Sequence, residues 1–281
     1  MASSRKLPRA SPESAVAAVD AAIAAALAEH VVHRARVAVA LSGGMDSMVL
    51  LDAAAAFVAR HPIALSAIHV DHGLSPNAGR WAEFCAAQCV LRDVPLATHR
   101  LRLERRRGES LEARARSARY ERLLAADVDA IILAHHADDQ AETVLLQLLR
   151  GAGPQGLAAM PRHRAGRPAL LRPLLELARA TLAAYAAARG LAWIDDESNA
   201  DRRHARNFLR HEIAPLLAAH FPGYPETLVR AARHQTEAAW RKSETMAAIA
   251  DVTSSDTGSE PIQPAYVSDR TRLLTRDGNR P

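Results

Sequence analysis

Short apolar runs alternate with amphipathic stretches along the first half of the chain. The runs at residues 37–41, 63–70, 95–101 and 130–133 predict buried strands. The stretches between them repeat apolar residues at helical spacing and predict helices at 14–29, 47–60 and 78–91, a fourth that opens at 110, and a fifth that ends near 150. Strands that alternate with helices in this way predict an α/β fold with a doubly wound, mostly parallel sheet.

The pattern changes after residue 150. A glycine-rich hinge at 151–156 and a basic loop at 162–167 precede predicted helices at 173–189, 202–218 and 226–250 and a short predicted strand at 191–194. From residue 251 onward, polar residues without periodicity predict an unstructured tail. We therefore expect an N-terminal helix (1–34), a strand–helix domain (35–195), a basic helical region (196–250) and a tail (251–281).

Composition narrows the class of protein. Aromatic residues make up 4% of the chain, so aliphatic side chains must fill the core. The two cysteines, Cys85 and Cys89, lie four apart on a predicted helix; they offer no disulfide framework and are expected to be small buried residues. No apolar run is long enough to span a bilayer, and the N-terminus does not resemble a signal peptide. We expect a cytoplasmic protein without a membrane partner.

The positive charge is unevenly distributed. Residues 1–149 hold 17 basic and 17 acidic side chains, whereas residues 150–250 hold 15 basic and 9 acidic ones. The excess in the second part of the chain favours a phosphate-rich partner there. Because Lys6 and Lys242 are the only lysines, nearly all of this charge is arginine, and a GC-rich genome would produce the same bias.

The junction between the first strand and its helix carries the most informative string, SGGMDS. Ser42, Gly43 and Gly44 form a turn after the strand, and Ser47 opens the helix. Main-chain N–H groups and the positive end of the helix dipole make such a turn an anion site. Asp46 beside an anion requires a cation between them, so we interpret it as a Mg²⁺ ligand. The alternative is a plain turn with Ser47 as the helix cap.

Two other strands end in polar groups. His69 belongs to the turn HVDHG after the second strand, at the edge where α/β sheets place ligands. Asp139 and Glu142 lie three apart on one face of the helix after the fourth strand. They suit a magnesium–triphosphate site or a substrate ammonium group; the alternative is complementation of the helix dipole. His135 and His136 lack further ligands at metal spacing, so hydrogen-bonding roles are expected for them.

These motifs together resemble those of the tRNA(Ile)-lysidine synthetases, a family of PP-loop ATP pyrophosphatases. The matching strings lie between residues 35 and 220 and are SGGMDS (42–47), HVDHGLSPNA (69–78), SLEARARSARY (110–120), HHADDQAETVLLQLLRGAGPQGLAAM (135–160), RPLLEL (172–177) and DESNADRRHARNFLRHEIAPLL (196–217). The resemblance implies a PP-loop domain at 35–195. It also implies a reaction in which ATP adenylates the wobble cytidine of the CAU anticodon of an isoleucine tRNA, and free lysine then displaces AMP. ATP and Mg²⁺ are the implied cofactors, and the oligomeric state, including a homodimer, stays open.

The resemblance also implies roles for individual residues. The ATP-binding set is Ser42, Gly43, Gly44, Met45, Asp46, Ser47 and His69; Asp46 and Asp139 would hold Mg²⁺; Glu142 and Arg206 would bind lysine; and Asp46, Asp139 and Arg206 would be catalytic.

Two alternatives remain open. One is another PP-loop tRNA-modifying or adenylating enzyme, although two cysteines do not supply the cluster that iron–sulfur thiolases need. The other is a non-catalytic tRNA- or nucleotide-binding remnant. Members of the resembling family usually continue into C-terminal domains that help grip tRNA, and the tail from residue 251 onward matches none of them. A short form, a truncated product and a frameshifted end all stay open as interpretations.

Overall fold

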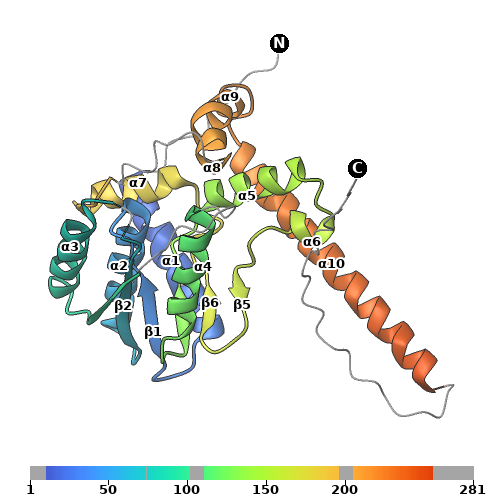
Figure 1. Cartoon of the computed structure of the whole chain (residues 1–281), viewed down its shortest axis with the longest axis horizontal. Coiled ribbons are helices and arrows are strands. Elements are labelled where there is room, and N and C mark those ends of the chain that lie inside the picture. Colours follow the sequence, from blue (N-terminus) through green and yellow to red (C-terminus); the bar gives the residue numbers. More distant parts are fainter. Residues whose placement is uncertain (1–10, 74, 102–110, 196–204, 256–281) are drawn as a thin grey trace, which may run out of the picture. The chain divides into compact units, whose positions relative to one another are not determined.

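A single six-stranded sheet forms the centre of the fold. The computed structural model describes residues 11–73, 75–101, 111–195 and 205–255. The strands are β1 (Arg36–Ala40), β2 (Ala64–Asp71), β3 (Leu96–Arg100), β4 (Ala130–Ile132), β5 (His163–Arg164) and β6 (Ala169–Leu171). They lie in the order β3-β2-β1-β4-β6-β5, and every neighbouring pair is parallel except β5 with β6 (Figure 1). The predicted mostly parallel α/β sheet is confirmed.

Successive side chains of the central strands pack alternately into two separate hydrophobic cores. Val37 and Val39 of β1 belong to one cluster of buried residues, whereas Ala38 and Ala40 belong to the other. This is the period of two that a strand buried on both faces produces. The first cluster also contains residues of α1 (Pro12–His30), α2 (Met45–Val58), α3 (Ala78–Val90) and α7 (Arg179–Ala188), and the second contains Leu123 of α4 (Leu111–Leu124). Helices therefore cover both faces, as predicted for a doubly wound fold.

The two cysteines confirm their predicted structural role. Cys85 and Cys89 on α3 are 0% and 1% exposed and belong to the larger core. Burial raises the pKa of the Cys85 thiol to about 12 and that of Cys89 to about 11. Both therefore remain protonated thiols at neutral pH.

Three predictions for residues 160–195 are wrong in detail. The basic loop expected at 162–167 contains β5 and turns back into β6, which the sequence analysis did not predict. The helix expected at 173–189 begins only at Arg179, because Leu174 and Leu175 are buried and the Leu177 carbonyl accepts the N–H of Ala137 at 2.8 Å.

The strand expected at 191–194 is also absent from this described segment. The N–H of Ile194 donates to the carbonyl of Gly43 at 2.9 Å, so the segment bonds to a turn and joins no strand of the sheet.

Helices dominate the rest of the chain. They are α5 (Ala137–Leu149), α6 (Pro154–Leu157), α8 (Ala205–Phe208), a π-helical turn (Leu209–Ile213), α9 (Ala214–His220) and α10 (Tyr224–Ser255). The first residues of the helix predicted at 202–218 lie outside the described residues, as do 256–281 of the predicted tail, and α10 ends five residues past the predicted 250. The chain divides into two compact units, Met1–Ala239 and Trp240–Pro281. Among the described residues, no helix combines the length and apolar character needed to cross a membrane.

Candidate active site

The glycine loop, residues 42–47, joins the end of β1 to the start of α2. The Ser47 hydroxyl accepts the N–H groups of Ser42 and Gly43 at 3.2 and 3.1 Å and the hydroxyl of Ser42 at 3.1 Å, and it donates to the Gly44 carbonyl at 2.9 Å. One side chain therefore fixes the path of the loop. Since Met48 makes the first intrahelical bond to Gly44, the N–H groups of the first turn of α2 have no partner within the helix and suit an anion.

Gly43 requires a glycine for two reasons. Its φ of +89° is a backbone conformation that other residues resist. A Cβ at this position would lie 2.9 Å from Cδ1 of Ile194 and 3.1 Å from Sγ of Cys85. The segment ending at Ile194 thus packs directly on the glycine loop.

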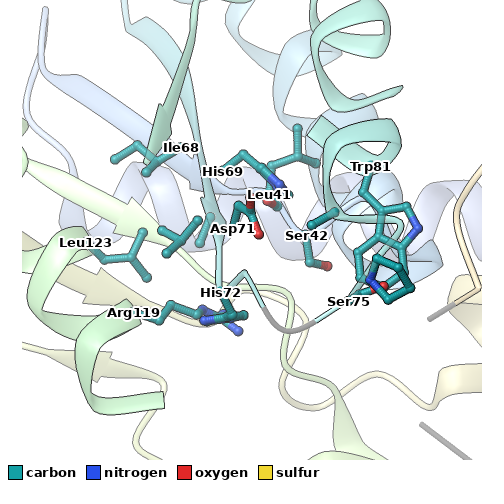
Figure 2. Close-up of a pocket in the computed structure, with 14 residues that line it drawn as sticks. Leu41, Ser42, Ile68, His69, Asp71, His72, Ser75, Trp81, Arg119 and Leu123 are labelled. Carbon is teal, nitrogen blue, oxygen red and sulfur yellow. Dashed lines mark hydrogen bonds between the residues drawn. The ribbon is translucent and has the colours of Figure 1, made fainter. Parts of the chain in front are cut away.

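A cavity of about 360 Å³ opens beside the glycine loop at the carboxyl ends of β1 and β2 (Figure 2). Its walls are largely apolar, with Trp81 of α3 on one side and Leu123 of α4 on the other (Figure 2). Ser42 and His69 both line it, so two predicted ATP-binding residues meet in one cavity. His69 Nδ1 lies 2.9 Å from the Leu41 carbonyl, which orients the ring. This volume and lining suit a nucleobase and its sugar.

An acidic cluster lies where β4 meets α5. The His136 ring places Nε2 at 3.5 Å from Asp46 Oδ2 and 3.4 Å from Asp139 Oδ2, and Nδ1 at 3.6 Å from Asp138 Oδ2. Burial by itself lowers the pKa of His136, but hydrogen bonds to Asp138 and Asp46 and the charge of Asp139 raise that pKa to about 10. The His136 ring therefore lies among three carboxylates, and its Nδ1 also accepts the main-chain N–H of Asp139 at 3.4 Å. The hydrogen-bonding role expected for His136 agrees with this geometry.

Asp46 and Asp139 meet the chemical requirements of a Mg²⁺ site. Among the described residues, Asp46 Oδ1 is buried without a hydrogen-bond partner, and it lies 3.8 Å from Arg179 Nε. Both carboxylates approach the same atom of His136, so they converge on one point. No group of three or more His, Cys, Asp or Glu side chains in the described residues has metal-binding geometry. This fits Mg²⁺, which proteins commonly hold with one or two carboxylates together with substrate phosphates.

Arg206 and Arg210 contact the acidic cluster at Glu142. Arg210 donates through Nε to Glu142 Oε1 at 2.7 Å, and through Nη2 to Glu142 Oε2 at 2.9 Å and Asp139 Oδ1 at 3.0 Å. Arg206 donates to Thr143 Oγ1 at 2.7 Å, and its Nε lies 3.6 Å from Glu142 Oε2. Burial raises the pKa of Glu142, and the Arg210 hydrogen bonds oppose that shift.

Arg210 is the site residue that the sequence analysis missed. Its position four residues after Arg206 places both on one helix face, and this spacing was the available signal. Gln140, in the same string as Asp139, has a structural role instead. Its amide donates to the Met160 carbonyl at 2.9 Å and accepts the Met160 N–H at 3.0 Å, which fastens the hinge segment to α5.

The predicted residues thus form two connected groups. Ser42, Gly43, Gly44, Met45 and Ser47 belong to the loop; Ser42 lines the cavity with His69, whereas Met45 is buried in the larger core. Asp46, Asp139, Glu142 and Arg206 form the acidic cluster with its arginines. The groups meet at Asp46, which belongs to the loop and contacts His136.

Comparison with known proteins agrees with this geometry. A family model described as a PP-loop domain matches residues 17–217. The chain is 53% identical over 204 residues to a tRNA(Ile)-lysidine synthase of Chromobacterium violaceum, a match that covers 72% of this chain and 47% of that protein. A tRNA(Ile)-lysidine synthase of Nitrosomonas europaea is 49% identical over 208 residues, with 73% and 45% covered. The chain spans about half the length of these curated relatives.

Among solved structures, a U34-tRNA thiolase of Methanococcus maripaludis has the same fold. The TM-score is 0.69 at 16% sequence identity, and the match covers 80% of each chain. Since the PP-loop match includes most of the 281 residues and the glycine loop lies at the strand–helix junction of a doubly wound sheet, the chain belongs to the PP-loop family.

Proposed function

We propose that this protein uses ATP to attach free lysine to the wobble cytidine in the CAU anticodon of an isoleucine tRNA. The observation that carries the proposal is the meeting of the glycine loop with the acidic cluster, where Asp46 and Asp139 both approach Nε2 of His136. The names of the relatives that share about half of their residues with this chain over more than 200 positions support the same reaction.

ATP would bind with its nucleoside in the cavity and its phosphates over the glycine loop. Because the Ser47 hydroxyl already engages the N–H groups of Ser42 and Gly43, the phosphates would meet the first turn of α2, at Met45 and Asp46. Asp46 and Asp139 would hold Mg²⁺, and the ion, when bound, would neutralise charge that develops on the leaving pyrophosphate.

The lysine substrate would bind at the arginine-lined end of the cluster. Glu142 is buried and would accept the substrate ammonium group, whereas Arg206 would bind the substrate carboxylate, which matches its planar guanidinium. Arg210 would hold Glu142 in position through its two hydrogen bonds.

The reaction would have two steps. The carbon-2 oxygen of the cytidine would attack the α-phosphorus of ATP, and pyrophosphate would leave. The lysine amine would then attack carbon 2 and displace AMP. The positive excess of residues 150–250 would bind the tRNA backbone.

The test is pyrophosphate release by the purified protein with ATP, Mg²⁺, lysine and the isoleucine tRNA, together with incorporation of labelled lysine into the RNA. We expect both signals with this tRNA and neither with a methionine tRNA that also carries CAU. Asp46→Asn should abolish both, whereas Asp20→Asn, an exposed aspartate of α1, should leave them unchanged.

Other outcomes would assign a different function. Pyrophosphate release without lysine incorporation would identify another adenylating enzyme of the PP-loop family. ATP binding without any release, in the presence of tRNA and lysine, would identify a non-catalytic binding protein.

A further inference from the structure

The cavity beside the glycine loop contains a cation to which the proposed function gives no role. Arg119 of α4 is partly buried and lines this cavity together with Ser42 and His69. Figure 2 shows its side chain extending from α4 on the same side as Leu123, with Trp81 across the cavity. Its neighbours on the wall include Ile68 and Val70, so a guanidinium faces a mostly apolar space.

No carboxylate among the described residues compensates this charge. Asp71, the acidic side chain that also lines the cavity, accepts the N–H of Gly73 at 2.7 Å through Oδ1 and lies 3.4 Å from Arg100 through Oδ2. Tyr120, Arg116 and His135 are among the groups that interact electrostatically with Arg119, and none of them is a carboxylate. Burial lowers the pKa of Arg119, yet an arginine stays charged at neutral pH.

A partly buried cation without a partner loses hydration free energy that a ligand of opposite charge can offset. Protein side chains supply no such charge here in the described part of the chain, and the cavity opens at the anion-binding loop. We propose that Arg119 binds a phosphoryl oxygen of the nucleotide that occupies this cavity. This inference rests on the proposed function for the identity of the ligand as an adenine nucleotide.

An RNA phosphate has the same chemistry, but the position of Arg119 favours the nucleotide. Arg116 and Arg122 of the same helix are exposed, so they are the side chains that an RNA backbone would reach from solvent. Arg119, in contrast, lines the cavity with the glycine-loop residue Ser42.

The test measures binding of adenosine, AMP and Mg²⁺–ATP by calorimetry to the full chain, its Arg119→Gln variant and the matched control Arg122→Gln. We expect Arg119→Gln to weaken AMP and ATP binding by about tenfold or more, because a charge-assisted hydrogen bond is lost, and to leave adenosine binding unchanged. Arg122→Gln should bind all three ligands like the parent chain.

Three results would overturn the inference. These are unchanged ATP affinity in Arg119→Gln, an equal loss of adenosine affinity, and a loss confined to tRNA binding. The proposed function fails separately: a chain in which Arg119→Gln weakens ATP binding, but which never incorporates lysine into tRNA, supports the inference and contradicts the reaction.

Melting temperatures, measured with and without ATP, separate a loss of ligand binding from a loss of folding stability when Arg119 is replaced. We expect Arg119→Met to melt at or above the temperature of the parent chain without nucleotide, since it removes a buried unpaired charge. We also expect it to lose most of the melting shift that ATP produces. A variant that melts well below the parent chain, with its ATP-induced shift intact, would show that Arg119 has a structural role instead.

Discussion

At the scale of single residues, one hydroxyl group organises the glycine loop. Ser47 is 4% exposed and is the shared partner of Ser42, Gly43 and Gly44. Ser47→Ala leaves the N–H groups of Ser42 and Gly43 without their acceptor, and Gly43 is buried, so we expect a loss of about 1–3 kcal/mol in the free energy of unfolding. ATP affinity should fall as well, because the loop loses its fixed path.

Urea denaturation with and without ATP measures both effects. The matched control is Ser66→Ala, since Ser66 Oγ lies 3.4 Å from a single carbonyl, that of Val37. Equal stability of the two variants would contradict the central role given to Ser47.

At the scale of elements, the segment after α7 supports the loop after β1. Gly43→Ala places a methyl group against Ile194 and requires a side chain at positive φ, so we expect about 1–3 kcal/mol of destabilisation and weaker ATP binding. The double variant Gly43→Ala/Ile194→Ala removes the closer of the two contacts but keeps the 3.1 Å approach to Cys85 Sγ and the φ of +89°.

The double variant should therefore recover only part of the ATP affinity, as measured by calorimetry. Complete recovery would mean that steric contact alone explains the need for glycine, and no recovery would mean that Ile194 does not matter. Ile194→Val, which keeps the main-chain bond to Gly43, should behave like the parent chain.

The link between the π-helical turn and α5 depends on one ion pair. Arg210→Gln leaves Glu142 buried without its bidentate partner. We expect a loss of about 3 kcal/mol, at the low end for a broken buried pair because Arg206 remains near the carboxylate. Glu142→Gln/Arg210→Gln should be more stable than Arg210→Gln alone, because residue 142 then carries no buried charge that lacks its bidentate partner.

Denaturation of the four proteins of this mutant cycle gives the coupling energy directly. Arg36→Gln is the exposed comparison, since its Asp127 partner is 87% exposed, and it should change stability much less. Additive effects of the two substitutions would show that Arg210 and Glu142 do not stabilise each other.

The sequence predicted the strands and site motifs whose patterns are contained in short stretches of the chain. The apolar runs of β1, β2 and β4 and the strings SGGMDS and HHADDQ each lie within a few consecutive residues, so pattern and chemistry agree there. It did not predict β5 and β6, because strands of two and three residues around Gly166 and Pro168 have the composition of a loop. The contact of Ile194 with Gly43 was missed because it joins residues far apart in the chain.

At the scale of the whole molecule, the nucleotide site lies within one of the two compact units. The loop, the cavity, the acidic cluster and both arginines belong to residues 1–239. A chain shortened after Ala239 should therefore unfold at a similar urea concentration and bind ATP with unchanged affinity, as measured by denaturation and calorimetry. Loss of ATP binding on this truncation would show that residues 240–281 contribute to the site.

The central position of β1 has a consequence for synthesis. The strand pairs on one side with β2 and on the other with β4, and the site draws on residues near 45, near 139 and near 210. A growing chain cannot complete this site until the last of these residues has left the ribosome. Nucleotide bound at the complete site can therefore stabilise only a nascent chain that has already closed β4 against β1, whereas the cavity, lined by residues from Ala40 to Leu123, can form earlier.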